Sequence, residues 1–182
     1  MGTVTKSDDR SGDARDAVDA VVQQWGRTRP DLDVSAMATL GRISRAQYLL
    51  HNSLQQLHRG FGVDPRSFDV LATLYRAGRP SLTPGELAKQ TMVGNAAMTN
   101  RLDQMVKQGW ITREVNETNR RELRVGLTEA GSAKLEEVLD AHVERQRDLL
   151  SALSPNDVSE LSRILRQFLI SQNDRATTSL GS

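Results

Sequence analysis

The fold is decided by the stretch Thr83–Leu127, which reads TPGELAKQTMVGNAAMTNRLDQMVKQGWITREVNETNRRELRVGL. It begins with Thr83 and Glu86, whose spacing is that of a capping box at the start of a helix. This short helix is expected to end at Gln90, and a turn over residues 91–94 follows it. The pattern predicts two consecutive helices joined by a tight turn.

The second helix is expected over residues 95–108. At 100° per residue its apolar side chains gather on one face, which predicts that this face is buried. The opposite face carries small, amide and charged side chains, and such side chains can approach base edges in the major groove of DNA. The residues assigned to this outer face are Asn95, Ala96, Thr99, Asn100, Asp103 and Lys107.

After Gly109 the period of the apolar residues changes from 3.6 to 2, which is typical of β-strands. The runs at 111–115 and 123–127 flank a polar loop, and they predict a hairpin whose tip carries Arg120 and Arg121. Two helices and a hairpin in this order predict a winged helix-turn-helix, in which the first helix braces the second in the major groove. Arginines at the tip can enter a minor groove or contact phosphates.

The alternative interpretation is a solvated helix face in a winged helix that binds another protein, with the two tip arginines serving only solubility. We favour DNA because Arg120 and Arg121 add positive charge beside the outer face of the second helix.

The rest of the chain is predicted to be mainly α-helical and to form one domain over residues 14–172. A short amphipathic helix precedes Gly26, and a helix that starts at Pro65 leads into the helix-turn-helix. The DNA-binding lobe is expected at about 64–127 and the dimerisation helices at about 34–60 and 128–171, with a disordered tail at 1–13 and a second tail at 173–182.

The composition excludes several classes of function. The chain of 182 residues has no cysteine, so disulfides, thiolate catalysis and Cys-based metal sites are excluded. No apolar run is long enough to span a bilayer and no signal peptide is recognisable, so a cytoplasmic protein is expected. His51, His58 and His142 lack a carboxylate-rich cluster around them, and we expect surface or interface histidines. Neither an enzyme nor a cofactor or metal is expected.

The chain resembles the MarR family of regulators over roughly residues 34–172. The resemblance is carried by ELA at 86–88, QGWI at 108–111 and VGLTEAG at 125–131, together with the arginines at the hairpin tip. It implies a homodimer that binds a near-palindrome in double-stranded DNA. A repressor is favoured, and an activator stays open as the alternative. Asn119 departs from the family, which usually has Asp there; because Asn offers only neutral hydrogen bonds, the tip is expected to be less rigidly held.

A narrower resemblance is to the urate-responsive subgroup of that family. It is carried by the extra N-terminal helix ending in Trp25 and by FDVL at 68–71. It implies a ligand site made of Trp25, Asp69, Arg76 and Arg101. Urate, another purine or a small polycarboxylate would each suit arginines beside an aromatic ring.

The residues partly support such a site independently. Asp69 and Arg76 share a helix face but lie about 10.5 Å apart along the axis, too far for a simple pair within one helix. Arg101 lies at the edge of the buried stripe of its helix and needs an anion, for which Asp69 is a reasonable candidate. The alternative is a structural salt bridge, with Trp25 only anchoring the extra helix.

Overall fold

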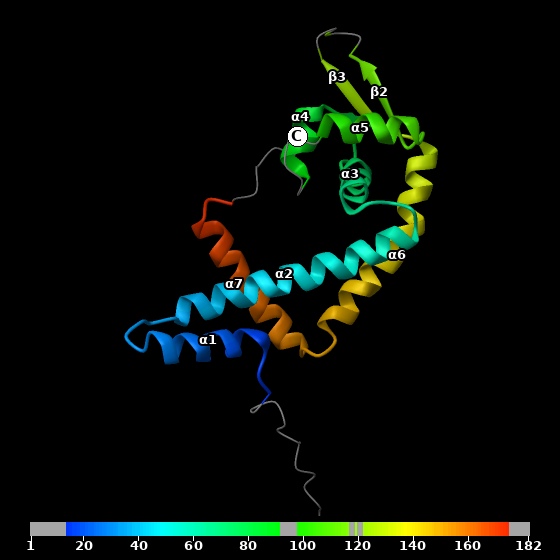
Figure 1. Ribbon diagram of the computed structural model, residues 1–182. Coiled ribbons are helices and arrows are strands. Elements are labelled where there is room, and N and C mark those ends of the chain that lie inside the picture. Colours follow the sequence, from blue (N-terminus) through cyan, green and yellow to red (C-terminus); the bar gives the residue numbers. More distant parts are fainter. Residues whose placement is uncertain (1–13, 92–97, 117–118, 120–121, 175–182) are drawn as a thin grey trace, which may run out of the picture. The chain divides into compact units, whose positions relative to one another are not determined.

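The computed structural model describes residues 14–91, 98–116, 119 and 122–174 (Figure 1). The chain divides into two compact units, one up to Asn52 and one from Ser53 onward. No helix in the described ranges is long and apolar enough to cross a membrane.

The first unit contains α1 (Ala17–Thr28) and the part of α2 (Ser35–Gly60) that precedes Ser53. Asp16 caps α1, and its carboxylate also accepts a hydrogen bond from Arg42 Nε on α2 at 2.8 Å. Arg42 Nη2 donates to Asp19 at 2.6 Å, so one guanidinium ties the first turn of α1 to α2. The short amphipathic helix predicted before Gly26 is confirmed, but it continues through Gly26 and ends at Thr28.

The second unit contains the predicted helix-turn-helix and hairpin. Its described helices are α3 (Pro65–Arg76), α4 (Pro84–Gln90), α5 (Met98–Lys107), α6 (Glu129–Leu150) and α7 (Pro155–Ser171). The capping box at Thr83 is confirmed, because its hydroxyl accepts from the Glu86 N–H at 3.1 Å and its own N–H donates to the Glu86 carboxylate at 2.7 Å. Caps at Asp64, Thr128 and Ser154 start the other helices whose beginnings are described. The start expected for α5, at residues 95–97, lies outside the described residues.

The strands are β1 (Ser81–Leu82), β2 (Ile111–Val115) and β3 (Leu123–Leu127), in an antiparallel sheet of order β1-β3-β2. The hairpin of β2 and β3 is confirmed, with Arg113 opposite Val125. The strand β1 extends the prediction, since its Leu82 pairs with Val125 and both side chains are fully buried. Two residues are too few to show an alternating pattern in the sequence, which is why β1 was not foreseen.

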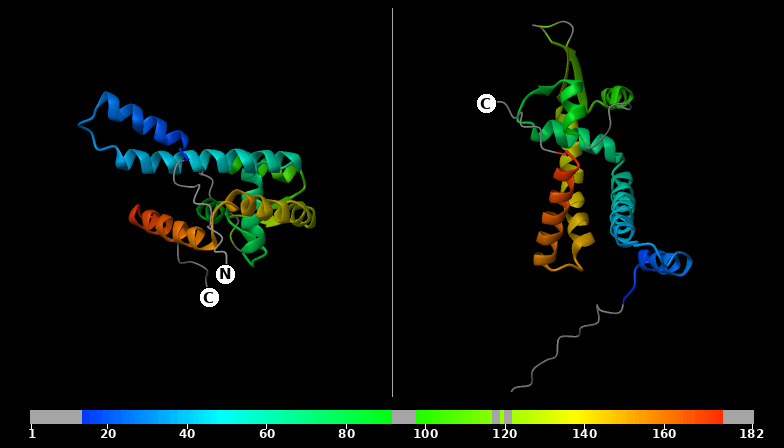
Figure 2. Two further views of the ribbon diagram at one scale, coloured as in Figure 1. Left: turned by 90° about the horizontal axis from the view of Figure 1, so that it is seen from below. Right: turned by 90° about the vertical axis from the view of Figure 1, so that its left-hand side faces the viewer.

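The base of the hairpin is fixed against the start of α6. The Thr128 hydroxyl accepts from the Gly131 N–H at 3.0 Å and donates to the Gly109 carbonyl at 2.7 Å. A Cβ at position 131 would lie 2.0 Å from the carbonyl oxygen of Trp110, so only glycine fits there. The segment VGLTEAG therefore brings the sheet and α6 into close contact. Figure 2 shows the hairpin and α6 from two further sides.

The core of the second unit is apolar and draws on α3, α4, α5, the sheet and α6. Its fully buried members, with no exposed surface, include Val70, Leu71, Leu82, Leu87, Leu102, Met105, Val125 and Val138. Met98, Leu102 and Met105 of α5 all belong to this core, so one face of the helix is buried. The predicted inner face of that helix is confirmed.

A histidine pair is packed beside this core, which corrects the expectation of a surface or interface position for His58. The His58 side chain is only 2% exposed. Its Nε2 lies 3.0 Å from Nδ1 of His142 on α6, and both rings stack on Phe68 of α3 with centroids 4.6 Å and 4.5 Å away. The amphipathic pattern of α2 could not reveal a polar ring that is buried through stacking with residues distant in the sequence.

Burial lowers the pKa of His58 from 6.5 to about 4, and the neighbouring His142 adds to this effect while Asp64 opposes it. Burial also lowers the pKa of His142. Both shifts favour the neutral rings, since a charged imidazolium would lose its hydration in this site.

The free energy of unfolding is therefore expected to fall as the pH is lowered from about 6.5 to about 4. The unfolded chain binds the His58 proton in this range while the folded chain does not, and the difference contributes about 3 kcal/mol. Urea unfolding at pH 8, 6 and 5, at fixed protein concentration, measures the effect. His58→Phe keeps an aromatic ring and should flatten the pH dependence, whereas His51→Phe, at an exposed position, should leave it unchanged. Equal pH dependence in wild type and His58→Phe would contradict the linkage.

Candidate nucleic-acid interface and ligand site

The outer face of α5 is exposed where the sequence predicted it. Thr99, Asn100, Asp103 and Lys107 are all exposed, while Met98 and Met105 on the other side are buried. The structure therefore presents hydroxyl and amide groups on a helix whose opposite face is fixed in the core. Asn95 and Ala96, assigned to the same face, lie outside the described residues.

Asp103 has a partner that the sequence did not predict. Arg113 Nη1 on β2 donates to its carboxylate at 2.6 Å, which links α5 to the hairpin. A free carboxylate beside DNA would repel phosphates, and the arginine offsets that charge. In the sequence, Arg113 alternates with Ile111 and Val115 on the strand face that is otherwise apolar. A charged side chain at such a position needs a partner.

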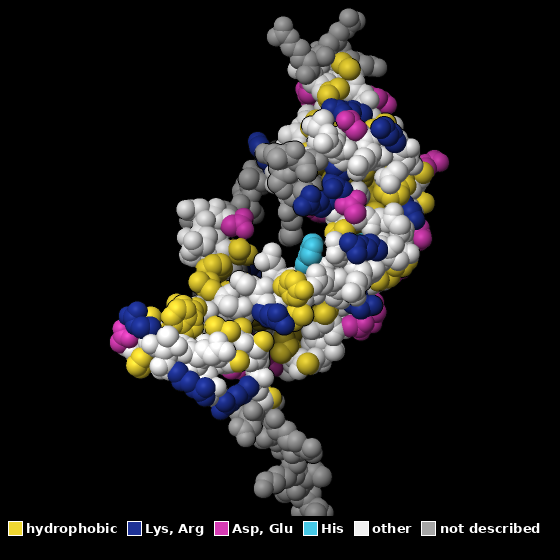
Figure 3. All heavy atoms as spheres, viewed as in Figure 1, with side chains coloured by type: hydrophobic (Ala, Val, Ile, Leu, Met, Phe, Trp, Pro, Cys, Tyr) yellow, Lys and Arg dark blue, Asp and Glu magenta, His cyan; other side chains and the backbone are white. Residues whose placement is uncertain are grey.

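The predicted tip arginines, Arg120 and Arg121, also lie outside the described residues. The described part of the loop is held by backbone hydrogen bonds. The Asn116 N–H donates to the Glu122 carbonyl at 2.8 Å, and the Glu122 N–H donates to the Asn119 carbonyl at 2.8 Å. Arg124 pairs with Glu122 at 2.6 Å beside this turn. Figure 3 shows Lys and Arg side chains, mixed with acidic ones, on the surface around α5 and the hairpin.

Arg101 lies on α5 against the first turn of α3. Its Nη1 donates to the carboxylate of Asp64 and, at 3.1 Å, to the hydroxyl of Ser67. The structure thus places Asp64 against this arginine. The role of Asp69 as its anion stays a prediction. Asp64 is the N-cap of α3 and Asp69 lies five residues further along the chain, and only the packing of α3 against α5 shows that Asp64 contacts Arg101.

Asp64 has two roles in this network. Its carboxylate caps α3 by accepting from the N–H groups of Arg66 at 3.1 Å and Ser67 at 3.2 Å. Burial acts to raise the pKa of Asp64, but the hydrogen bond from Ser67 and the charge of Arg101 outweigh burial and hold the pKa below its usual value. The carboxylate is therefore charged at neutral pH and can balance the guanidinium.

The other residues proposed for a ligand site are distributed over both units. Arg76 Nη2, at the end of α3, donates to the backbone carbonyl of Gln90 at 3.1 Å. Asp69 is half-buried on the same helix. Trp25 belongs to the first unit and is 37% exposed. The second unit thus holds one carboxylate and two guanidinium groups of the predicted set, on α3 and α5.

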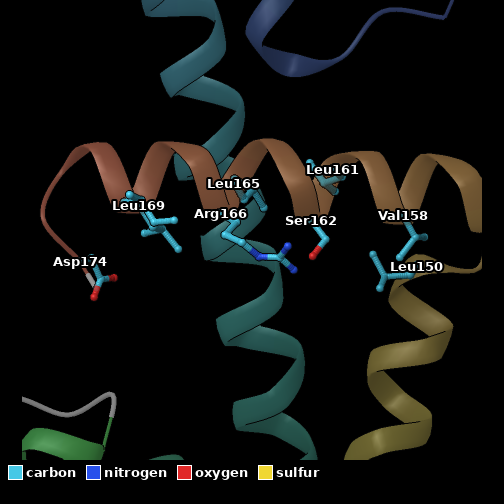
Figure 4. A pocket seen from close by; sticks show the side chains of 9 residues that line it. Leu150, Val158, Leu161, Ser162, Leu165, Arg166, Leu169 and Asp174 are labelled. Atoms are coloured by element: carbon cyan, nitrogen blue, oxygen red, sulfur yellow. The ribbon is translucent and has the colours of Figure 1, made fainter. Parts of the chain in front are cut away.

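The C-terminal helix α7 carries a large apolar surface. Leu161, Ile164, Phe168, Leu169 and Ile170 are each at least 40% exposed. A groove of about 1110 Å³ follows the helix (Figure 4), with Leu150, Val158, Leu161, Leu165 and Leu169 along it. Apolar side chains in such number on one surface mark a site of protein association.

Comparison with known proteins identifies the family of this chain. Residues 63–123 match the sequence profile of the MarR family. The chain is also 37% identical over 149 residues to the HTH-type transcriptional regulator PecS of Dickeya dadantii (strain 3937), which covers 81% of this chain and 90% of PecS. The chain belongs to the MarR family. The resemblance inferred from the sequence and the winged helix-turn-helix fold are both confirmed.

Two further relatives support this assignment. The transcriptional repressor MprA of Escherichia coli (strain K12) is 33% identical over 121 residues, which cover 66% of this chain and 68% of MprA. A crystal structure of mutant MarR from Escherichia coli complexed with operator DNA superposes with a TM-score of 0.67 at 27% identity, covering 75% of this chain and 97% of that chain. These relatives are transcriptional regulators, and no family of enzymes is indicated.

Proposed function

We propose that this MarR-family protein is a transcriptional repressor that acts in the cytoplasm. In this proposal it binds a near-palindromic operator as a homodimer, and a small anionic ligand such as urate releases it. The observation that carries the proposal is the exposure of Thr99 and Asn100 on α5, a helix whose other face is buried in the core beside the hairpin.

The case for DNA starts from the chemistry of the exposed face. An Asn side chain can make two hydrogen bonds to an adenine edge, and a Thr can contact a base or the thymine methyl group. Lys107 at the end of α5 adds a cation that suits a phosphate. The relative MprA is named a repressor and MarR is known in complex with operator DNA, and both support the same role here.

The case for a homodimer rests on the apolar surface of α7. Two copies that cover these surfaces against each other would remove Leu161, Phe168 and their neighbours from water, which is the main driving force of stable association. An obligate interface of this kind buries about 2,000 Å² or more. A two-fold dimer presents two copies of α5, and these match two half-sites of a near-palindrome.

The case for an anionic ligand rests on Arg76. Arg76 donates to the neutral Gln90 carbonyl, a bond that does not balance its positive charge, and this charge can attract an anion. A flat anion held by Arg76 and stacked on Trp25 would bring negative charge close to Asp69. Like charges at a few ångströms repel, so the Asp69 carboxylate would shift or take a proton. The helix α3, which holds Arg101 of α5 through Asp64 and Ser67, would carry this change to α5.

Substitution of Asn100 tests the assigned DNA face. Asn100→Ala should weaken binding to the promoter fragment upstream of the protein's own gene by about 1–3 kcal/mol, with little change on a scrambled duplex. Arg120→Ala should weaken binding to both and lower the salt slope by about 1. Fluorescence anisotropy at several salt concentrations measures both affinities, with Gln23→Ala on α1 as the control. Unchanged promoter affinity in both variants would contradict this DNA face and favour the protein-interaction alternative.

A release titration tests the ligand. Adding urate to the complex with promoter DNA should dissociate the wild type, with a coupling free energy of about 1–3 kcal/mol between urate and DNA. Trp25→Ala and Arg76→Ala should bind DNA normally but require at least about tenfold more urate. Arg79→Ala, which removes the same charge three residues beyond the end of α3, should respond like wild type. Xanthine and citrate, titrated in parallel, distinguish a purine site from a polycarboxylate site. If wild type ignores all three anions, Arg76 and Trp25 have structural roles only.

A further inference from the structure

Two ion pairs tie α5 to the rest of the second unit, one on each side of the helix. Arg101 is bonded to Asp64 and Ser67 at the start of α3, and Asp103 is bonded to Arg113 on β2. Two residues along a helix correspond to a rotation of about 200°, so the two pairs hold nearly opposite sides of α5. Together they can fix the rotation of this helix about its own axis.

The apolar stripe of α5 restrains the rotation of the helix less precisely than these ion pairs do. Met98, Leu102 and Met105 bury one face, but burial of apolar surface has no preferred direction. Hydrogen bonds between charged groups are directional and short. Since Asn100 is adjacent to Arg101 in the helix, an ion pair that fixes Arg101 also fixes the direction in which Asn100 leaves the helix.

The pair with Asp64 is the better protected of the two. The Arg101 side chain is 14% exposed, compared with 26% for Arg113. The Ser67 hydroxyl accepts from Arg101 Nη1 and donates to the second carboxylate oxygen of Asp64 at 2.5 Å, which closes a ring of three side chains. Less solvent around the pair means less screening, so this tie should restrain α5 more strongly than the one to β2.

We propose that Asp64 is a positioning residue for sequence recognition: by holding Arg101, it sets the rotation of α5 and thus the alignment of Asn100 and Thr99 with the bases. This inference rests on the proposed DNA-binding function and adds a residue to it that touches no DNA. It gives the N-cap carboxylate of α3 a second role besides starting that helix.

The substitution Asp64→Asn separates these two roles. Asn is as good an N-cap as Asp, so the hydrogen bonds from Arg66 and Ser67 N–H groups can be kept. The charge that balances Arg101 is lost. Removing a carboxylate also makes the protein more positive, which strengthens its general attraction to DNA. Specific affinity should therefore fall while non-specific affinity stays equal or rises, and a simple loss of folding would not have this effect.

The chain offers a matched control in Asp16. This residue caps α1 and accepts from Arg42 Nε at 2.8 Å, so Asp16→Asn removes the same charge from the same kind of cap and pair in the first unit. Ser67→Ala removes the hydroxyl from the ring but keeps the ion pair, and it should have a smaller effect than Asp64→Asn. Asp64→Asn combined with Arg101→Gln should lose no more specificity than Asp64→Asn alone, because both substitutions break the same ion pair.

The test measures the ratio of affinities of the full-length protein for the promoter fragment and for a scrambled duplex of equal length. We expect Asp64→Asn to lower this ratio by about tenfold, with affinity for the scrambled duplex equal to or above that of wild type, and Asp16→Asn to leave the ratio within about twofold. Thermal melting of each variant reports on folding. If Asp64→Asn keeps the wild-type ratio, or loses both affinities together with its melting transition, the positioning role is overturned while the proposed function stands. If wild type itself does not prefer the promoter fragment, the proposed function and the role of Asp64 both fail.

Discussion

The arrangement of this protein depends on burying one face of α5. Met98, Leu102 and Met105 pack into a core that also receives residues of α3, α4, the sheet and α6. Because that face is fixed, the opposite face must remain in solvent, and it carries Asn100 and Thr99. The hairpin is attached to the same core through Ile111 and Val125, so helix and wing are presented together. Apolar packing thus creates the surface on which a polar function can be placed.

Polar interactions fix the orientation of the elements where apolar packing alone leaves it undetermined. Asp64 and Arg113 hold α5 from opposite sides, and Thr128 joins the base of the hairpin to α6. These groups cost free energy to desolvate, and the cost is offset only when their partners are correctly placed. Their value therefore lies in defining one geometry more than in adding stability. A protein that must match two half-sites on DNA needs such definition, because small rotations of each reading helix move its side chains away from the bases.

The sequence was sufficient for features that depend on neighbouring residues. The capping box at Thr83, the change of period after Gly109 and the buried face of α5 all follow from local spacing, and the structure confirms them. Features that depend on packing between distant elements were missed or misassigned. The strand β1 is defined by its pairing with β3, His58 is buried by Phe68 and His142, and the contact of Asp64 with Arg101 depends on how α3 meets α5.

The central claim is that two copies of α5 read one operator, and hydroxyl-radical footprinting of the wild-type protein on the promoter fragment upstream of its own gene tests it most directly. A two-fold dimer should protect two half-sites on one face of the duplex, with centres about 10 base pairs apart or a multiple of this spacing, and with related sequences in inverted orientation. Protection of a single half-site at saturation, or uniform protection without related sequences, would contradict a dimer that reads DNA through α5.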